Sequence, residues 1–74
     1  MLSGKHGVIF FAAYVLQLQG QLEEAIEHYQ RSINTFPTAE AYTFLGWTYS
    51  RMGRYKDAIR EAQRAIALDH TFLL

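Results

Sequence analysis

Three histidines are the side chains of this sequence best suited to hold a metal ion or to move a proton near neutral pH. His6, His28 and His70 stand more than twenty residues apart, and the chain contains no cysteine. Metal ligands usually recur at close spacing, such as one helical turn. The histidines lack that spacing, so the sequence predicts no metal site and no bound cofactor.

The adjacent acids Glu23 and Glu24 suggest acid–base chemistry, but they open a segment with helical periodicity. Carboxylates in a first helical turn are favoured by the helix dipole, and no nucleophile accompanies this pair. The segment 4–7, which reads Gly-Lys-His-Gly, lacks the spacing of a phosphate-binding loop. The sequence therefore predicts a protein that is not an enzyme.

Composition narrows the class of partner. Seven basic residues balance seven acidic ones, which disfavours nucleic acid or an anionic membrane as the main partner. Half of the residues are hydrophobic, which predicts a folded domain. Because the net charge is zero, copies of the chain lack the electrostatic repulsion that would oppose self-association.

The expected location is the cytoplasm, because the chain has no cysteine to form disulfides. A secretory signal is the alternative, since Lys5 and His6 precede an apolar run over 8–16. The segment 17–20, Gln-Leu-Gln-Gly, offers no small-residue cleavage site, and we favour a helix there.

The chain repeats with a period of 33 residues. The segment 20–33 aligns with 53–66, and the identical pairs include Gly20 with Gly53 and Ala25 with Ala58. A fixed period of this size indicates stacked copies of one unit, each of which buries its apolar face on its neighbour. Such a chain is expected to offer a binding or assembly surface.

Helical periodicity predicts four helices, over residues 7–19, 22–35, 39–52 and 55–68. Gly20 and Gly53 stand where left-handed C-terminal caps are wanted, Thr38 can cap the third helix, and Pro37 separates the units. The links are so short that consecutive helices must run antiparallel. The fold class is therefore all-α, with two tandem helix-turn-helix hairpins.

These residues resemble the tetratricopeptide repeat, whose pattern is W-x2-L-G-x2-Y, then A-x3-F, then P. The second unit carries Tyr42, Leu45, Gly46, Tyr49, Ala58, Ala62 and His70 at these positions. The first carries Ile9, Ala12, Ala13, Leu16, Ala25, Tyr29 and Pro37. Ala62 and His70 depart from the pattern. The resemblance implies one domain over 1–74, an α-solenoid fragment with repeats at about 6–37 and 39–72.

The resemblance also implies that the first helix of each unit lines a concave face that binds a protein or peptide. The residues expected there are Phe10, Tyr14, Gln17, Thr43, Trp47, Ser50 and Arg51. Phe10 and Tyr14 occupy positions where family members that clamp a carboxylate carry Lys and Asn, so an apolar peptide is the expected ligand. Trp47, Phe10 and Tyr14 could instead pack within the stack.

Self-assembly is the alternative function. A stable stack normally needs at least three repeats, and only two are visible here. The residues expected to be left uncovered are Ile59, Ile66, Leu68, Phe72, Leu73 and Leu74. The sequence predicts a homodimer or a higher homo-oligomer, joined by like ends or by helix exchange. A third hypothesis is that the chain is a fragment of a longer repeat-containing protein.

Overall fold

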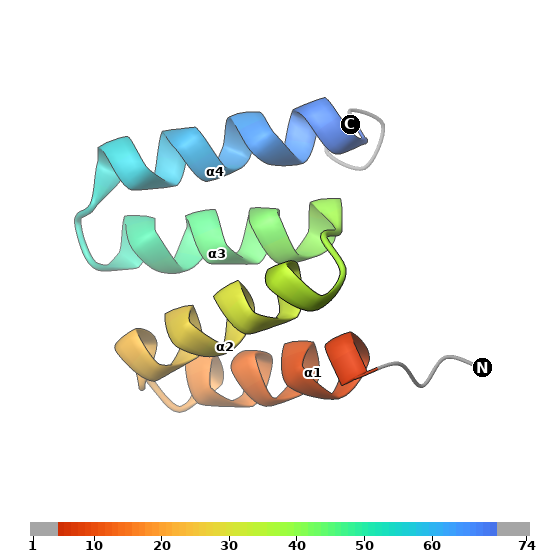
Figure 1. Cartoon of the computed structure of the whole chain (residues 1–74). Coiled ribbons are helices and arrows are strands. Elements are labelled where there is room, and N and C mark those ends of the chain that lie inside the picture. The colour runs from red at the N-terminus through yellow and green to blue at the C-terminus, as the bar shows by residue number, and fades with distance from the viewer. Residues whose placement is uncertain (1–4, 70–74) are drawn as a thin grey trace.

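The computed structural model describes residues 5–69, which form four helices and no strand. They are α1 (Lys5–Leu18), α2 (Leu22–Thr35), α3 (Ala39–Arg51) and α4 (Tyr55–Leu68). Consecutive helices run antiparallel and are stacked in chain order from α1 at one end to α4 at the other (Figure 1). The fold class predicted from the sequence is confirmed, and the helix bounds differ from the predicted ones by at most two residues.

The turn inside each hairpin follows from one glycine. Gly20 has a φ of 82° and Gly53 a φ of 79°, in the left-handed region where a side chain would be strained. The next amide then reaches back over the helix end, so that Gln21 N–H donates to Leu16 O and Arg54 N–H to Tyr49 O, both at 2.9 Å. This bonding pattern satisfies carbonyls that the helix end leaves open, and it reverses the chain within the three residues that separate the helices.

The turn between the hairpins depends on a side-chain cap. Thr38 has extended backbone, and its Oγ1 accepts a hydrogen bond from Ala41 N–H at 3.1 Å. This bond satisfies one of the free amides at the start of α3, as the sequence predicts. Pro37 lies between α2 and α3, where no helical hydrogen bond is required of it.

The core lies where α3 meets the first hairpin. Its buried side chains are Ala13, Ala25, Ile26, Tyr29, Leu45 and Tyr49. Phe44 on α3 closes this cluster, with ring centroids 5.7 Å from Phe10, 5.9 Å from Tyr14 and 6.3 Å from Tyr29. Because aromatic rings bury large apolar areas, Phe44 joins the two hairpins most strongly at this point.

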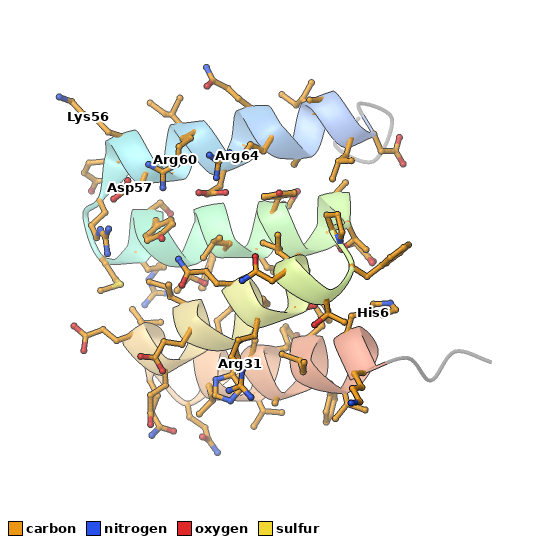
Figure 2. The ribbon with its side chains drawn as sticks, in the orientation of Figure 1. His6, Arg31, Lys56, Asp57, Arg60 and Arg64 are labelled. Carbon is orange, nitrogen blue, oxygen red and sulfur yellow. The ribbon has the colours of Figure 1, made fainter. Side chains whose placement is uncertain are left out.

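A chain of ion pairs runs along α4. The Asp57 carboxylate contacts both Arg54 and Arg60 at 2.7 Å, and the Glu61 carboxylate contacts Arg60 at 3.0 Å and Arg64 at 3.3 Å. Figure 2 shows Asp57, Arg60 and Arg64 on the side of α4 that faces α3, whereas Lys56 points away from α3. The guanidinium partners hold the pKa of Asp57 below its ordinary value, mainly through the hydrogen bonds from Arg60 and Arg54.

Candidate functional site

An open groove lies between α3 and α4, at the end of the stack that α4 forms. Gly46 lets the two helices approach closely, because a Cβ there would stand only 3.1 Å from Ala58 O. The groove has a volume of about 380 Å³. The residues that line it, named here the end groove, are Thr43, Gly46, Trp47, Ser50, Ala58, Ile59 and Ala62.

The walls of the end groove are apolar and accessible. Trp47 on α3 is 42% exposed, and Ile59 on the facing side of α4 is also exposed. Small side chains at Gly46, Ala58 and Ala62 leave the space between them unfilled. A concave apolar surface with a few polar groups is the usual form of a binding site, so the end groove is suited to take up an apolar side chain or helix ridge.

Polar groups around the groove differ in whether they are satisfied. Ser50 Oγ donates to Trp47 O at 2.7 Å within its own helix. Thr43 Oγ1 is buried and has no hydrogen-bond partner among the described residues. Because Thr43 Oγ1 is shielded from the surface, it offers no direct contact to a ligand, and Ser50 is the other polar side chain of the lining.

Arg51 stands beside the groove and covers part of Trp47. Its guanidinium carbon lies 5.0 Å from the centre of the indole ring. This cation–π contact holds Trp47 in place on the surface and leaves the guanidinium edge free for further contacts. Trp and Arg are the side chains most often found at the energetic centre of protein interfaces.

The same surface in the first hairpin is covered by α3. The 33-residue offset relates Ile26 to Ile59 and Tyr29 to Ala62; Ile26 and Tyr29 are buried, whereas Ile59 and Ala62 are exposed. Phe44 occupies the position over the first hairpin that nothing occupies over the second within the described residues. The end groove is thus the counterpart of a helix-docking surface that the chain already uses once.

The structure brings together three of the predicted concave-face residues of the second unit, since Thr43, Trp47 and Ser50 all line the end groove. In the first unit, Tyr14 is partly exposed and Phe10 packs against the core. Gln17 is buried, and its Oε1 accepts hydrogen bonds from Tyr29 Oη at 2.6 Å and Thr48 Oγ1 at 3.4 Å. Gln17 therefore ties the two hairpins together, and a role in ligand contact stays a prediction.

The phenol of Tyr29 is fixed as the donor of that hydrogen bond. Burial, with a smaller effect from the nearby Tyr14 hydroxyl, raises the pKa of Tyr29 above its ordinary value. The group stays protonated over the pH range in which proteins are folded, and it donates to Gln17 Oε1. This network serves the packing between hairpins and offers no free acid or base.

The residues predicted for self-association lie on α4 and beyond it. Ile59 and Ile66 are exposed and, at a spacing of seven residues, share one uncovered apolar face of α4. Leu68 is also exposed, but on another side of the helix, beside the link between α2 and α3. Phe72, Leu73 and Leu74 lie outside the described residues. Exposed apolar side chains of this kind are typical of a surface that contacts another protein.

Sequence reasoning missed two features of the second hairpin. Glu61 is buried, although nothing marked it as different from other acids on α4. Its spacing from Ala58 and Ala65, by three and four residues, places it on the stripe that faces α3 and was the available signal. The sequence analysis also assigned no role in a binding surface to Ala58 and Ala62, which line the end groove.

Among residues 5–69, no group of three His, Asp or Glu side chains lies close enough to hold a metal ion. Within the same range, no helix is long and apolar enough to cross a membrane. The chemistry that the described surface offers is apolar contact, aromatic stacking and single hydrogen bonds.

Comparison with known families gives one result. The family model described as Tetratricopeptide repeat matches residues 9–69, which includes all of α2, α3 and α4 and most of α1. The chain belongs to the tetratricopeptide repeat family. Members of this family generally mediate protein–protein interactions and are typically non-catalytic scaffolds that bind proteins or peptides. No curated protein and no solved structure matches the chain significantly.

Proposed function

We propose that this tetratricopeptide repeat chain is a non-catalytic scaffold that binds an apolar protein segment in the end groove and on the adjoining concave face. The observation that carries the proposal is the open apolar groove between α3 and α4, with Trp47 and Ile59 exposed on its two walls. Contact of such a surface with water is unfavourable, and the free energy falls when an apolar partner covers it.

The composition of the groove supports a protein partner. Trp47 supplies a large rigid surface at a small cost in conformational entropy, and Arg51 stacked on it supplies a charged edge. Apolar contact then provides most of the affinity, and the Arg51 guanidinium restricts the orientation of the ligand.

The ligand is not expected to need a free C-terminal carboxylate. Phe10 and Tyr14 stand where a carboxylate clamp would need Lys and Asn, and both rings contact Phe44. An internal segment of a partner protein therefore suits this face as well as a terminal one.

The test is a peptide selection followed by titration. Random 12-residue peptides are displayed and selected on the immobilised chain, and the best binder is synthesised with a free acid and with an amide at its C-terminus. Trp47, the only tryptophan of the sequence, reports binding by its fluorescence. Both forms should bind with Kd values within about threefold of each other, since a carboxylate contact would contribute more than this.

Two variants locate the bound peptide. Ile59→Glu places a charge on the wall of the end groove and should weaken binding at least tenfold, because the charge is desolvated without a partner. Lys56→Glu changes charge on the side of α4 that points away from α3 and should leave Kd unchanged (Figure 2). Equal Kd values for both variants, or loss of binding on amidation, would contradict the proposal.

Self-association is a second candidate function, favoured by a separate observation. Ile66 extends the exposed apolar face of α4 beyond the end groove, and α1 exposes apolar side chains at the other end of the stack. Surfaces at both ends of a two-hairpin stack allow copies of the chain to add to one another.

A further inference from the structure

The internal repeat shows what kind of element covers the surface that the end groove presents. Over the first hairpin this element is α3, through a ridge formed by Ala41, Phe44 and Thr48 at helical spacing of three and four residues. Ala41 and Thr48 are fully buried, and Phe44 contacts three aromatic rings below it. The ridge is small at its ends and aromatic in the middle.

The same ridge occurs 33 residues earlier, on α1. Its members are Val8, Phe11 and Val15, which correspond to Ala41, Phe44 and Thr48. Two of its three side chains are largely uncovered by the described residues, since Val8 is 68% and Phe11 is 65% exposed. In Figure 1, α1 lies at the opposite end of the stack from α4. The molecule thus exposes an apolar ridge at one end and an apolar groove at the other.

We propose that the partner of the end groove is α1 of a second copy of this chain, docked head to tail in the way that α3 docks on the first hairpin. The inference rests on the proposed function, since it names the occupant of the same groove. It is supported by continuity with an interface the chain already forms between its own hairpins. At an offset of 33 residues the chain carries both surfaces of that interface a second time. The ridge on α1 lies at one end of the stack, and the end groove lies at the other.

The central contact of this arrangement is well matched in size. Phe44 sits over Phe10, Tyr14 and Tyr29, whose counterparts in the second hairpin are Thr43, Trp47 and Ala62. All three counterparts line the end groove. The smaller side chains at positions 43 and 62 leave the space in which the Phe11 ring of the second copy would lie, with Trp47 beside it.

The 33-residue offset also shows which polar side chains would meet at the proposed interface. Between the hairpins, Thr48 Oγ1 donates to Gln17 Oε1, and the counterparts of this pair are Val15 and Ser50. Valine needs no partner, and Ser50 Oγ already donates to Trp47 O. Docking therefore leaves neither side chain with an unsatisfied polar group. The proposed interface is more apolar than the interface between the two hairpins of one chain.

The symmetry of the contact sets the form of the assembly. Groove and ridge are different surfaces, so the interface is heterologous, and each added copy presents a new groove. The contact joins one helix to one groove, which is a small surface compared with the ~1,200 Å² buried in a standard stable complex. We therefore expect the association to be weak and to grow with concentration.

Sedimentation equilibrium from about 10 µM to about 1 mM is the experiment, with matched variants at the two ends. The average mass of the wild type should rise above 8.6 kDa without levelling at a dimer. Phe11→Glu removes the ridge and Ile59→Glu blocks the groove, so each variant alone should stay a monomer. Lys56→Glu should behave as the wild type.

An equimolar mixture of the two variants gives the sharpest result. Phe11→Glu keeps an intact groove and Ile59→Glu keeps an intact ridge, so the mixture should form a pair of chains and stop there. A wild type that stays monomeric overturns the inference. So does a Phe11→Glu variant that still associates, which would indicate a dimer of like ends, or a mixture that stays monomeric. Circular dichroism checks that both variants are helical; both replaced side chains are exposed, so folding should be unaffected.

Failure of this inference and failure of the proposed function give different results. The Phe11→Glu variant cannot supply a ridge, yet its groove is intact and should bind the selected peptide. If the selected peptide binds but the wild type stays monomeric, a second copy of the chain is not the partner of the end groove. The proposed peptide-binding function is then retained. Loss of peptide binding in Phe11→Glu and in the wild type removes the proposed function itself.

Discussion

Ile26 and Ile59 stand at the same position of two successive hairpins, yet Ile26 is 7% exposed and Ile59 is 59% exposed. The neighbouring pair, Tyr29 and Ala62, differs in the same direction, from fully buried to exposed. Both hairpins have the same helix spacing and the same glycine turn. The contrast therefore arises from what lies on top of each hairpin, since α3 covers the first and no described residue covers the second.

The side chains have diverged to match this difference. The covered face carries Tyr29 and Phe10, which fill the interface with α3, whereas the open face carries Ala62 and Thr43. The second hairpin carries a chain of ion pairs along α4, where the Asp57 and Glu61 carboxylates contact three arginines. One hairpin is stabilised by burial, and the other leaves an apolar surface free for a partner.

The largest loss of stability should come from a substitution on the face of the first hairpin that α3 covers. Tyr29→Ala removes a buried ring that stacks over Phe44 and donates to Gln17, and should destabilise the fold by about 3–5 kcal/mol. Ala62→Ser at the equivalent position should stay within about 0.5 kcal/mol of wild type, because that side chain is exposed. Urea unfolding followed by circular dichroism measures both.

Tyr29→Phe sharpens the same test. It keeps the ring and removes only the hydroxyl, so the loss should be about 1 kcal/mol. Similar losses for Tyr29→Ala and Ala62→Ser would mean that the two faces do not differ as described.

An intermediate effect is expected where the helices of the second hairpin meet. Gly46→Leu and Ala58→Leu should each destabilise by about 1–3 kcal/mol, because even a Cβ at Gly46 would lie 3.1 Å from Ala58 O. Glu23→Gln, at an exposed position of α2, should stay within about 0.5 kcal/mol. Equal urea midpoints for the three variants would show that α3 and α4 do not approach closely.

The smallest effect concerns acid stability of the second hairpin. The pKa of Asp57 is lowered in the folded state by Arg60 and Arg54, so its ionised form favours folding. This contribution is present above the unfolded pKa of about 4 and is lost as the pH falls through the lowered folded value. The stability difference between wild type and Asp57→Asn should therefore shrink in acid.

Amide hydrogen exchange of α4 and α2, measured from pH 7 downward, resolves where this effect acts. Only α4 should show the pH-dependent difference between the two proteins, because the ion pairs lie on α4. Glu23→Gln controls for the loss of one negative charge elsewhere. A difference that is constant with pH, or equal in both helices, would contradict the assignment.

Local signals made most of the fold predictable. Gly20 and Gly53 ended helices where a positive φ was needed, and Thr38 capped α3 through its side chain, as expected. These features act over a few residues, so they can be read from spacing and residue type alone. The largest difference, the start of α1 at Lys5 in place of residue 7, lies where no side-chain cap or proline fixes the boundary, and the ends of α1 and α3 differ by one residue before their glycine turns.

The candidate site was only partly accessible to the same reasoning. Thr43, Trp47 and Ser50 were predicted for a binding face and do line the end groove. Gln17 has the same position in its unit as Ser50, yet it is buried against Tyr29 and Thr48. Position within a repeat therefore did not distinguish a residue that binds a neighbouring hairpin from one that faces solvent.

What the sequence determined by itself was the unit: its length, its glycine turn, its two amphipathic helices and its repetition. These depend on hydrogen bonds and side-chain spacing within one hairpin. Which copies of a shared apolar face are covered was decided only by the tertiary structure. Burial depends on where the next helix lies, and for Ile26 that helix is α3, whereas for Ile59 the described chain provides none.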